Sequence, residues 1–290
     1  LTKSTLRFYR DIYKLYLKPR VGKVKLRDFK TSHAQAVLDS IDLSHQTLLR
    51  IKTCMSAAFT VAQQKDLVAV NPIGAAKAEG KRKRFHGYAY TLKEIKYMLS
   101  VLDGTARTVV ALAAFTGMRE GEIRGLRWSD YAGDILNVNR AIWRTHVGLP
   151  KTEDSESYVP VIKPLRLILD EHKRLTNGTD GYIFAGPKKN FALNLDNLAK
   201  REIKPVLGER WHGYHAFRRG LATDMFGLGV PAEVSQILLR HADAATTRKH
   251  YLKLQGHKQG AAAMKQLEGA IHKAKFGQGM GNSKKRDSAS

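Results

Sequence analysis

The sequence is short of acidic residues, of cysteine and of long hydrophobic runs. Its 290 residues include 26 Asp and Glu against 50 Lys and Arg, which gives a formal net charge of +24. An excess of this size along most of the chain points to a polyanionic partner. Nucleic acid is favoured over an anionic membrane, because the sequence shows no long basic amphipathic helix.

Other absences exclude further classes of protein. The single cysteine, Cys54, cannot form an intrachain disulfide and fits a reducing cytosol. The longest apolar run, at 109–115, is far too short to span a bilayer, and no signal peptide is visible. The 11 histidines lack metal-ligand spacing, and no glycine-rich phosphate loop occurs. We therefore expect a cytoplasmic protein with no membrane partner, no metal and no cofactor.

The length of 290 residues suggests about two domains, and with 43% apolar residues the chain can form cores. Residues 1–76 are expected to form a helical DNA-binding domain. Apolar spacing predicts helices up to Pro19, over 32–41, and from an N-cap at Ser44 towards the Asn71–Pro72 turn. Residues 77–90 are expected to be a basic interdomain linker. Within it, phosphate contact is expected of Lys81, Arg82, Lys83 and Arg84, with a solvated charge run as the alternative.

The following stretch, 91–275, is expected to be a mainly helical α+β catalytic domain with a small antiparallel sheet. Thr91 and Glu94 form a capping box, and a later helix should break at Thr116–Gly117. The segments 135–144 and 157–162 have the alternation of strands, and helices resume at Lys163. Residues 276–290 are rich in Gly, Ser and Lys and are expected to be a flexible tail.

Cations recur at positions suited to binding an anion. Arg119 follows a glycine-containing break at the start of a helix, where free amides also favour an anion. Glu122 lies one turn later and is placed to hold that guanidinium or a neighbouring histidine; a plain surface ion pair is the alternative. His215 and Arg218 are three residues apart, on one helical face. Arg124 and Arg127 are interpreted as surface or DNA-contact residues.

Two further residues could take part in chemistry at a bound phosphate. Lys151 opens a polar turn between expected strands, where it is either solvated or able to protonate a departing alkoxide. Tyr251 is the candidate nucleophile, preceded by His250 and, ten residues upstream, by His241. A phenol has a pKa of about 10, so its attack at neutral pH needs neighbouring cations.

Together, the segments TGMREGEIRGLRWSD, KTEDSESYVPV, YHAFRRGLAT and LLRHADAATTRKHYLK resemble the tyrosine recombinases, specifically the phage-type integrases, over about residues 91–260. The resemblance implies a role for each candidate. Arg119 and Arg218 would clamp the scissile phosphate, with His215 as acid/base partner and Glu122 in support. Lys151 would protonate the leaving 5′-oxygen. His241 would hydrogen-bond the phosphate, and Tyr251 would form a 3′-phosphotyrosine link.

The resemblance also implies a homotetramer on double-stranded DNA attachment sites in a bacterial host, a Holliday-junction intermediate, and no need for ATP or metal. Two features depart from the family pattern. The ten-residue interval from His241 to Tyr251 is one longer than the commonest spacing, and there is room for only one small domain before the catalytic one. The rival hypotheses are a type IB topoisomerase-like enzyme, a catalytically inactive DNA-binding or architectural protein, and an RNA-binding protein.

Overall fold

A computed structural model describes residues 2–81, 87–148, 157–188 and 190–240. The chain forms two compact units, Leu1–His86 and Gly87–Ser290, which we describe separately. In the described ranges, no helix is both long and apolar enough to cross a membrane.

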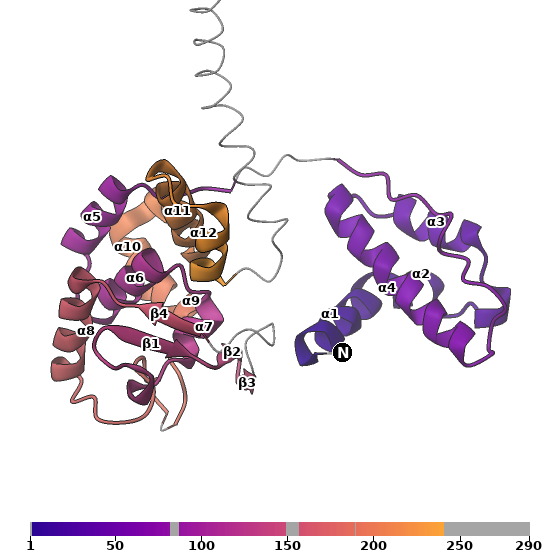
Figure 1. Cartoon of the computed structure of the whole chain (residues 1–290). Coiled ribbons are helices and arrows are strands. Elements are labelled where there is room, and N and C mark those ends of the chain that lie inside the picture. The colour runs from indigo at the N-terminus through magenta and orange to yellow at the C-terminus, as the bar shows by residue number, and fades with distance from the viewer. Residues whose placement is uncertain (1, 82–86, 149–156, 189, 241–290) are drawn as a thin grey trace, which may run out of the picture. The chain divides into compact units, whose positions relative to one another are not determined.

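The first unit is entirely helical (Figure 1). Its helices are α1 (Lys3–Ile12), α2 (Lys18–Val21), α3 (Thr31–Asp39) and α4 (His45–Gln64). Ser44 caps α4 by accepting a hydrogen bond from the Thr47 amide, as the sequence predicts. A π-helical turn, Tyr13–Leu17, joins α1 to α2 ahead of Pro19, whose ring cannot continue the regular hydrogen-bond ladder.

The core of the first unit is built from one face of each long helix. Val37 and Leu38 of α3 pack with Leu48, Ile51 and other apolar residues of α4. Cys54 lies in this core, and burial raises the pKa of its thiol. The first residues of the expected linker lie on this unit, because Lys77 N–H donates to Gln35 and His45 N–H donates to the Lys81 carbonyl.

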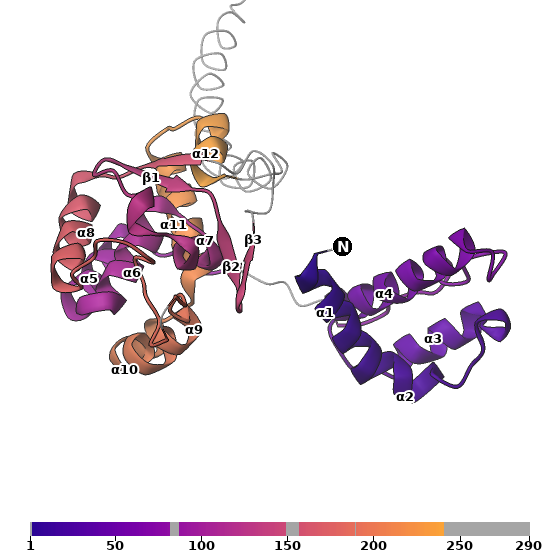
Figure 2. The same cartoon turned by 90° about the horizontal axis from the view of Figure 1, so that it is seen from below.

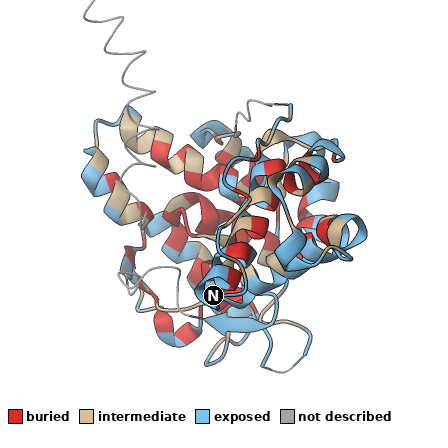
Figure 3. Ribbon diagram, turned by 90° about the vertical axis from the view of Figure 1, so that its right-hand side faces the viewer, coloured by how far each residue is buried: buried red, intermediate tan, exposed pale blue. Residues whose placement is uncertain are grey.

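Buried residues, drawn red in Figure 3, form the core of the second unit, and most residues of helix α6 (Gly104–Thr116) are among them. Its helices are α5 (Leu92–Val101), α6 (Gly104–Thr116), α7 (Glu120–Gly125), α8 (Lys163–Leu175), α9 (Leu195–Leu198), α10 (Lys204–Leu207), α11 (Tyr214–Gly227) and α12 (Ala232–Leu239). Helix α6 is apolar almost all round, since α5, α8 and α11 each pack against it. Thr91 and Glu94 form the predicted capping box of α5.

Two antiparallel strand pairs lie beside these helices (Figures 1 and 2). Strand β1 (Ile135–Val138) pairs with β4 (Ser157–Pro160), and β2 (Ala141–Trp143) pairs with β3 (His146–Gly148). The mainly helical fold with a small antiparallel sheet confirms the predicted fold class. The sequence did not predict β3.

Candidate active site

The site begins at the end of α6, where the chain turns sharply. Gly117 ends the helix in the left-handed conformation, with φ of +60°, and its amide donates to the Ala113 carbonyl. The Thr116 hydroxyl then accepts from the Met118 amide at 3.2 Å. Two residues after Gly117, Arg119 is the N-cap of α7. The predicted break therefore places Arg119 at a helix start.

Glu122 holds Arg119 from the first turn of α7. Its Oε1 accepts from Arg119 Nη1 at 2.7 Å, and its Oε2 accepts from the Arg119 amide at 2.9 Å. Glu122 is only 3% exposed. Burial pushes the pKa of Glu122 upward, but Arg240, together with the amide and guanidinium of Arg119, outweighs burial and leaves the pKa below its ordinary value. This carboxylate is a buried anchor and not a surface ion pair.

Arg218 approaches the same turn from α11. Its Nη1 donates to the Gly117 carbonyl at 2.7 Å, and its Nη2 donates to the Leu239 carbonyl at the end of α12. The residue is 4% exposed. Burial and the nearby charge of Arg119 lower the pKa of Arg218. A bound anion would offset both effects, which is the electrostatic condition expected of a phosphate site.

His215 lies one turn before Arg218 on α11, where it remains accessible to solvent although its ring is partly covered. Partial burial of the ring lowers the pKa of His215, and the charges of Arg219, Arg218 and Arg119 lower it further. The imidazole is therefore mainly neutral at pH 7 when no anion is bound. The structure thus brings together three predicted residues, Arg119, His215 and Arg218, with Glu122 as their support.

Arg240 also belongs to this group; it lies in the segment LLRHADAATTRKHYLK, but no role was predicted for it. It caps the C-terminus of α12, its side chain is only 6% exposed, and its Nη2 donates to Glu122 Oε2 at 3.1 Å. Its carbonyl accepts from Arg119 Nη2 at 2.9 Å. A buried arginine beside a predicted carboxylate has no local sequence signal, because the contact spans 118 residues.

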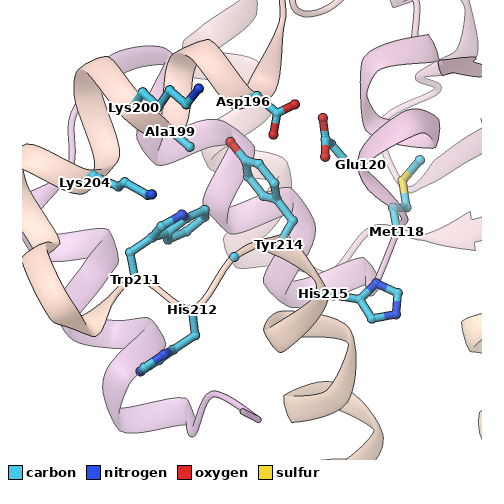
Figure 4. A pocket seen from close by; sticks show the side chains of 11 residues that line it. Met118, Glu120, Asp196, Ala199, Lys200, Lys204, Trp211, His212, Tyr214 and His215 are labelled. Carbon is cyan, nitrogen blue, oxygen red and sulfur yellow. The ribbon is translucent and has the colours of Figure 1, made fainter. Parts of the chain in front are cut away.

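A pocket of about 340 Å³ adjoins His215 (Figure 4). Glu120 and Asp196 line one part of it, and Trp211 and His212 line another. Burial and the charge of Asp196 raise the pKa of Glu120, with Arg124 opposing them. The described residues contain no cluster of three or more His, Cys, Asp or Glu able to hold a metal ion.

One sequence interpretation is wrong. Arg124 is 8% exposed and is neither a surface nor a DNA-contact residue. Its guanidinium donates to the carbonyls of Leu193 at 3.1 Å and Arg144 at 2.7 Å, and so ties α7 to the β2–β3 turn. Arg127, by contrast, is exposed and lies over the Tyr182 ring at 5.1 Å from its centroid.

Several predicted site residues lie outside the described residues: Lys151, His241, Tyr251, Arg82, Lys83 and Arg84. The expected tail at 276–290 lies outside them as well. Lys81 is described and is exposed.

Comparisons with known proteins agree on one family. The model described as "Phage integrase family" matches residues 89–257, and the chain belongs to this family. A tyrosine recombinase XerC-like protein from Caldanaerobacter subterraneus subsp. tengcongensis is 26% identical over 244 residues, covering 72% of this chain and 62% of that protein. The chain spans between 58% and 62% of the length of three curated relatives, this one included.

Solved structures share the fold. The Tn1549 transposon integrase, in complex with a circular intermediate DNA, has a TM-score of 0.71 and 18% identity, covering 87% of this chain and 90% of that one. A lambda integrase tetramer bound to a Holliday junction has a TM-score of 0.65 and 17% identity, covering 86% and 72%. At this identity the likeness establishes the fold alone.

Proposed function

We propose that the protein is a site-specific DNA recombinase that cleaves and rejoins strands through a 3′-phosphotyrosine on Tyr251. The observation that carries the proposal is that two guanidiniums, those of Arg218 and Arg119, donate to the consecutive backbone carbonyls of Leu239 and Arg240. Arg218 donates to the carbonyls of Gly117 and Leu239, and Arg119 donates to that of Arg240. Two planar cations fixed this closely suit the non-bridging oxygens of one phosphodiester.

The chemistry follows from these charges. The Tyr251 hydroxyl attacks phosphorus and gives up its proton, for which neutral His215 is the proposed acceptor. Arg119 and Arg218 stabilise the extra negative charge of the pentacoordinate transition state, and His241 adds a hydrogen bond. The P–O5′ bond breaks, and Lys151 protonates the departing 5′-oxygen. A 5′-hydroxyl from another strand reverses these steps, so the bond energy is conserved and no ATP is needed.

Charge and fold support double-stranded DNA as the partner. The net charge of +24 favours a polyanion, and the Tn1549 integrase that shares this fold was solved with DNA. The tetramer of lambda integrase on a Holliday junction supports a homotetramer here as well. In this proposal residues 1–76 form a DNA-binding domain and residues 91–275 form the catalytic domain. Residues 77–90 link the two domains, and Lys81 to Arg84 contact DNA phosphates. The protein acts in the bacterial cytoplasm.

Strand exchange tests the proposal. Purified protein is mixed with two labelled duplexes that carry attachment sites, and the products are resolved after protease treatment. We expect recombinant duplexes and Holliday junctions. Relaxation of supercoiled plasmid without strand exchange would instead favour the topoisomerase-like enzyme. DNA binding with neither reaction would favour the inactive DNA-binding protein.

A further inference from the structure

We infer that Arg240 is a positioning residue that holds Arg119 and Glu122 in the orientation needed to bind the scissile phosphate. The inference deepens the proposed function and rests on it. The backbone of Arg240 has φ of +53° and ψ of +50°, a left-handed conformation that glycine adopts freely and that Cβ disfavours. The side chain of Arg240 makes an interaction that offsets this cost.

That interaction is with Glu122. The guanidinium of Arg240 is almost fully buried, with Nη2 at 3.1 Å from Glu122 Oε2 and Nη1 at 3.2 Å from the Leu238 carbonyl. Glu122 Oε1 accepts a hydrogen bond from Arg119 Nη1 at 2.7 Å. One carboxylate therefore lies between two guanidiniums, one in the proposed phosphate clamp and one at the end of α12.

The backbone of Arg240 closes a ring of contacts. Its carbonyl accepts from Arg119 Nη2 at 2.9 Å. The hydrogen bonds thus form a closed loop: Arg119 donates to the Arg240 carbonyl and to Glu122, and the Arg240 guanidinium donates to Glu122. Both acceptors that direct the Arg119 fork thus depend on the left-handed turn at Arg240. Without its side chain, Glu122 would lose one of its two cation partners, and its carboxylate would be held by Arg119 alone.

The two effects of Arg240, on the backbone and on charge, can be separated by substitution. R240G removes the guanidinium while favouring the same backbone conformation. R240K keeps a positive charge but lacks the planar fork. N177G is the matched control, because Asn177 also has a positive φ, of 49°. Asn177 lies just beyond the end of α8, and its amide donates to the Arg174 carbonyl. It relieves the same kind of backbone strain elsewhere in the unit.

The first readout separates chemistry from DNA binding and folding. For R240G we expect the single-turnover rate of covalent adduct formation to fall on the order of 10- to 100-fold, as misplacement of a clamping group does. DNA affinity should fall by no more than Arg119→Ala lowers it, since R240G disturbs only that one phosphate contact. R240K should recover part of the rate, and N177G should match the wild type. A wild-type rate in R240G would overturn the inference.

A second experiment tests the positioning of Arg119 by DNA binding alone, without cleavage. The dissociation constant for attachment-site duplex is measured for wild type, Arg119→Ala, R240G and the double variant. If Arg240 positions Arg119, the loss of affinity caused by Arg119→Ala is smaller in the R240G background; equal losses overturn the inference. Absence of any adduct with wild-type protein contradicts the proposed function instead, and this binding cycle still decides the role of Arg240.

Discussion

Glu122 is the residue on which the site depends most, because its buried carboxylate contacts both Arg119 and Arg240. Removing one member of a buried ionic group leaves the others uncompensated, which costs several kcal/mol. The same contacts that would direct the proposed phosphate clamp also join α7 to the end of α12.

The pH dependence of stability tests this role. The folded-state pKa of Glu122 lies below its ordinary value of 4.5. Its stabilisation is consequently complete above that value and is lost as pH falls through the folded-state pKa. We expect Glu122→Gln to lower the free energy of unfolding by about 3 kcal/mol at pH 7, and by progressively less as pH falls below 4.5. Urea unfolding at a series of pH values measures the difference.

Glu171→Gln is the control for that series. Glu171 forms an ion pair with Arg107 at 3.6 Å, but its side chain is 51% exposed. An exposed pair contributes about 0–1 kcal/mol, so this variant should unfold almost as the wild type does. Equal losses in the two variants would show that Glu122 is not a buried anchor.

At the scale of elements, the turn between α6 and α7 sets the geometry of the clamp. A Cβ on Gly117 would lie 2.7 Å from Leu239 Cδ2 and 3.1 Å from Leu221 Cδ2, at a φ that side chains disfavour. We expect Gly117→Ala to destabilise the protein by about 1–3 kcal/mol and to slow adduct formation, because the Gly117 carbonyl supports Arg218. Urea unfolding and single-turnover cleavage measure the two effects.

Gly133→Ala isolates the backbone part of that effect. Gly133 has φ of +85°, and a Cβ there would meet nothing within 4 Å. This variant should show a loss of stability from backbone strain alone and normal cleavage. If it slowed cleavage as much as Gly117→Ala, the link between the turn and Arg218 would be wrong.

Signals confined to a few adjacent residues were predictable from the sequence. The cap at Ser44, the capping box at Thr91 and the break at Gly117 depend on neighbours in the chain, and all three are confirmed. Strand β3 was missed because the β2–β3 turn has Arg144 at positive φ, where glycine or asparagine would be the usual signal.

Contacts between distant segments were not predictable in this way. The burial of Arg124 depends on the carbonyls of Leu193 and Arg144, and that of Arg240 on Glu122. Because arginine is usually exposed, the sequence alone predicts that Arg124 and Arg240 lie at the surface. The convergence of Arg119, His215 and Arg218 was expected only because their motifs together resemble a known family.

At the scale of the whole molecule, the net charge of +24 predicts salt-sensitive DNA binding. Replacing Lys81, Arg82, Lys83 and Arg84 with Gln should weaken binding to specific and unrelated DNA alike. The slope of log K against log salt should become shallower by about 0.9 for each DNA phosphate that these side chains no longer neutralise. Binding titrations at several salt concentrations measure this slope. An unchanged slope would show that the basic segment is solvated and does not contact DNA.

The most direct test of the proposed function is the covalent link itself. Wild-type protein and Tyr251→Phe are incubated with an attachment-site duplex nicked next to the scissile phosphate, so that the cleaved product cannot religate. Denaturing gels and peptide mapping then locate any adduct. We predict a 3′-phosphate link on Tyr251 in the wild type, and none in Tyr251→Phe, with nearly unchanged DNA affinity. An adduct that persists in Tyr251→Phe, or wild-type binding without any adduct, would contradict the proposal.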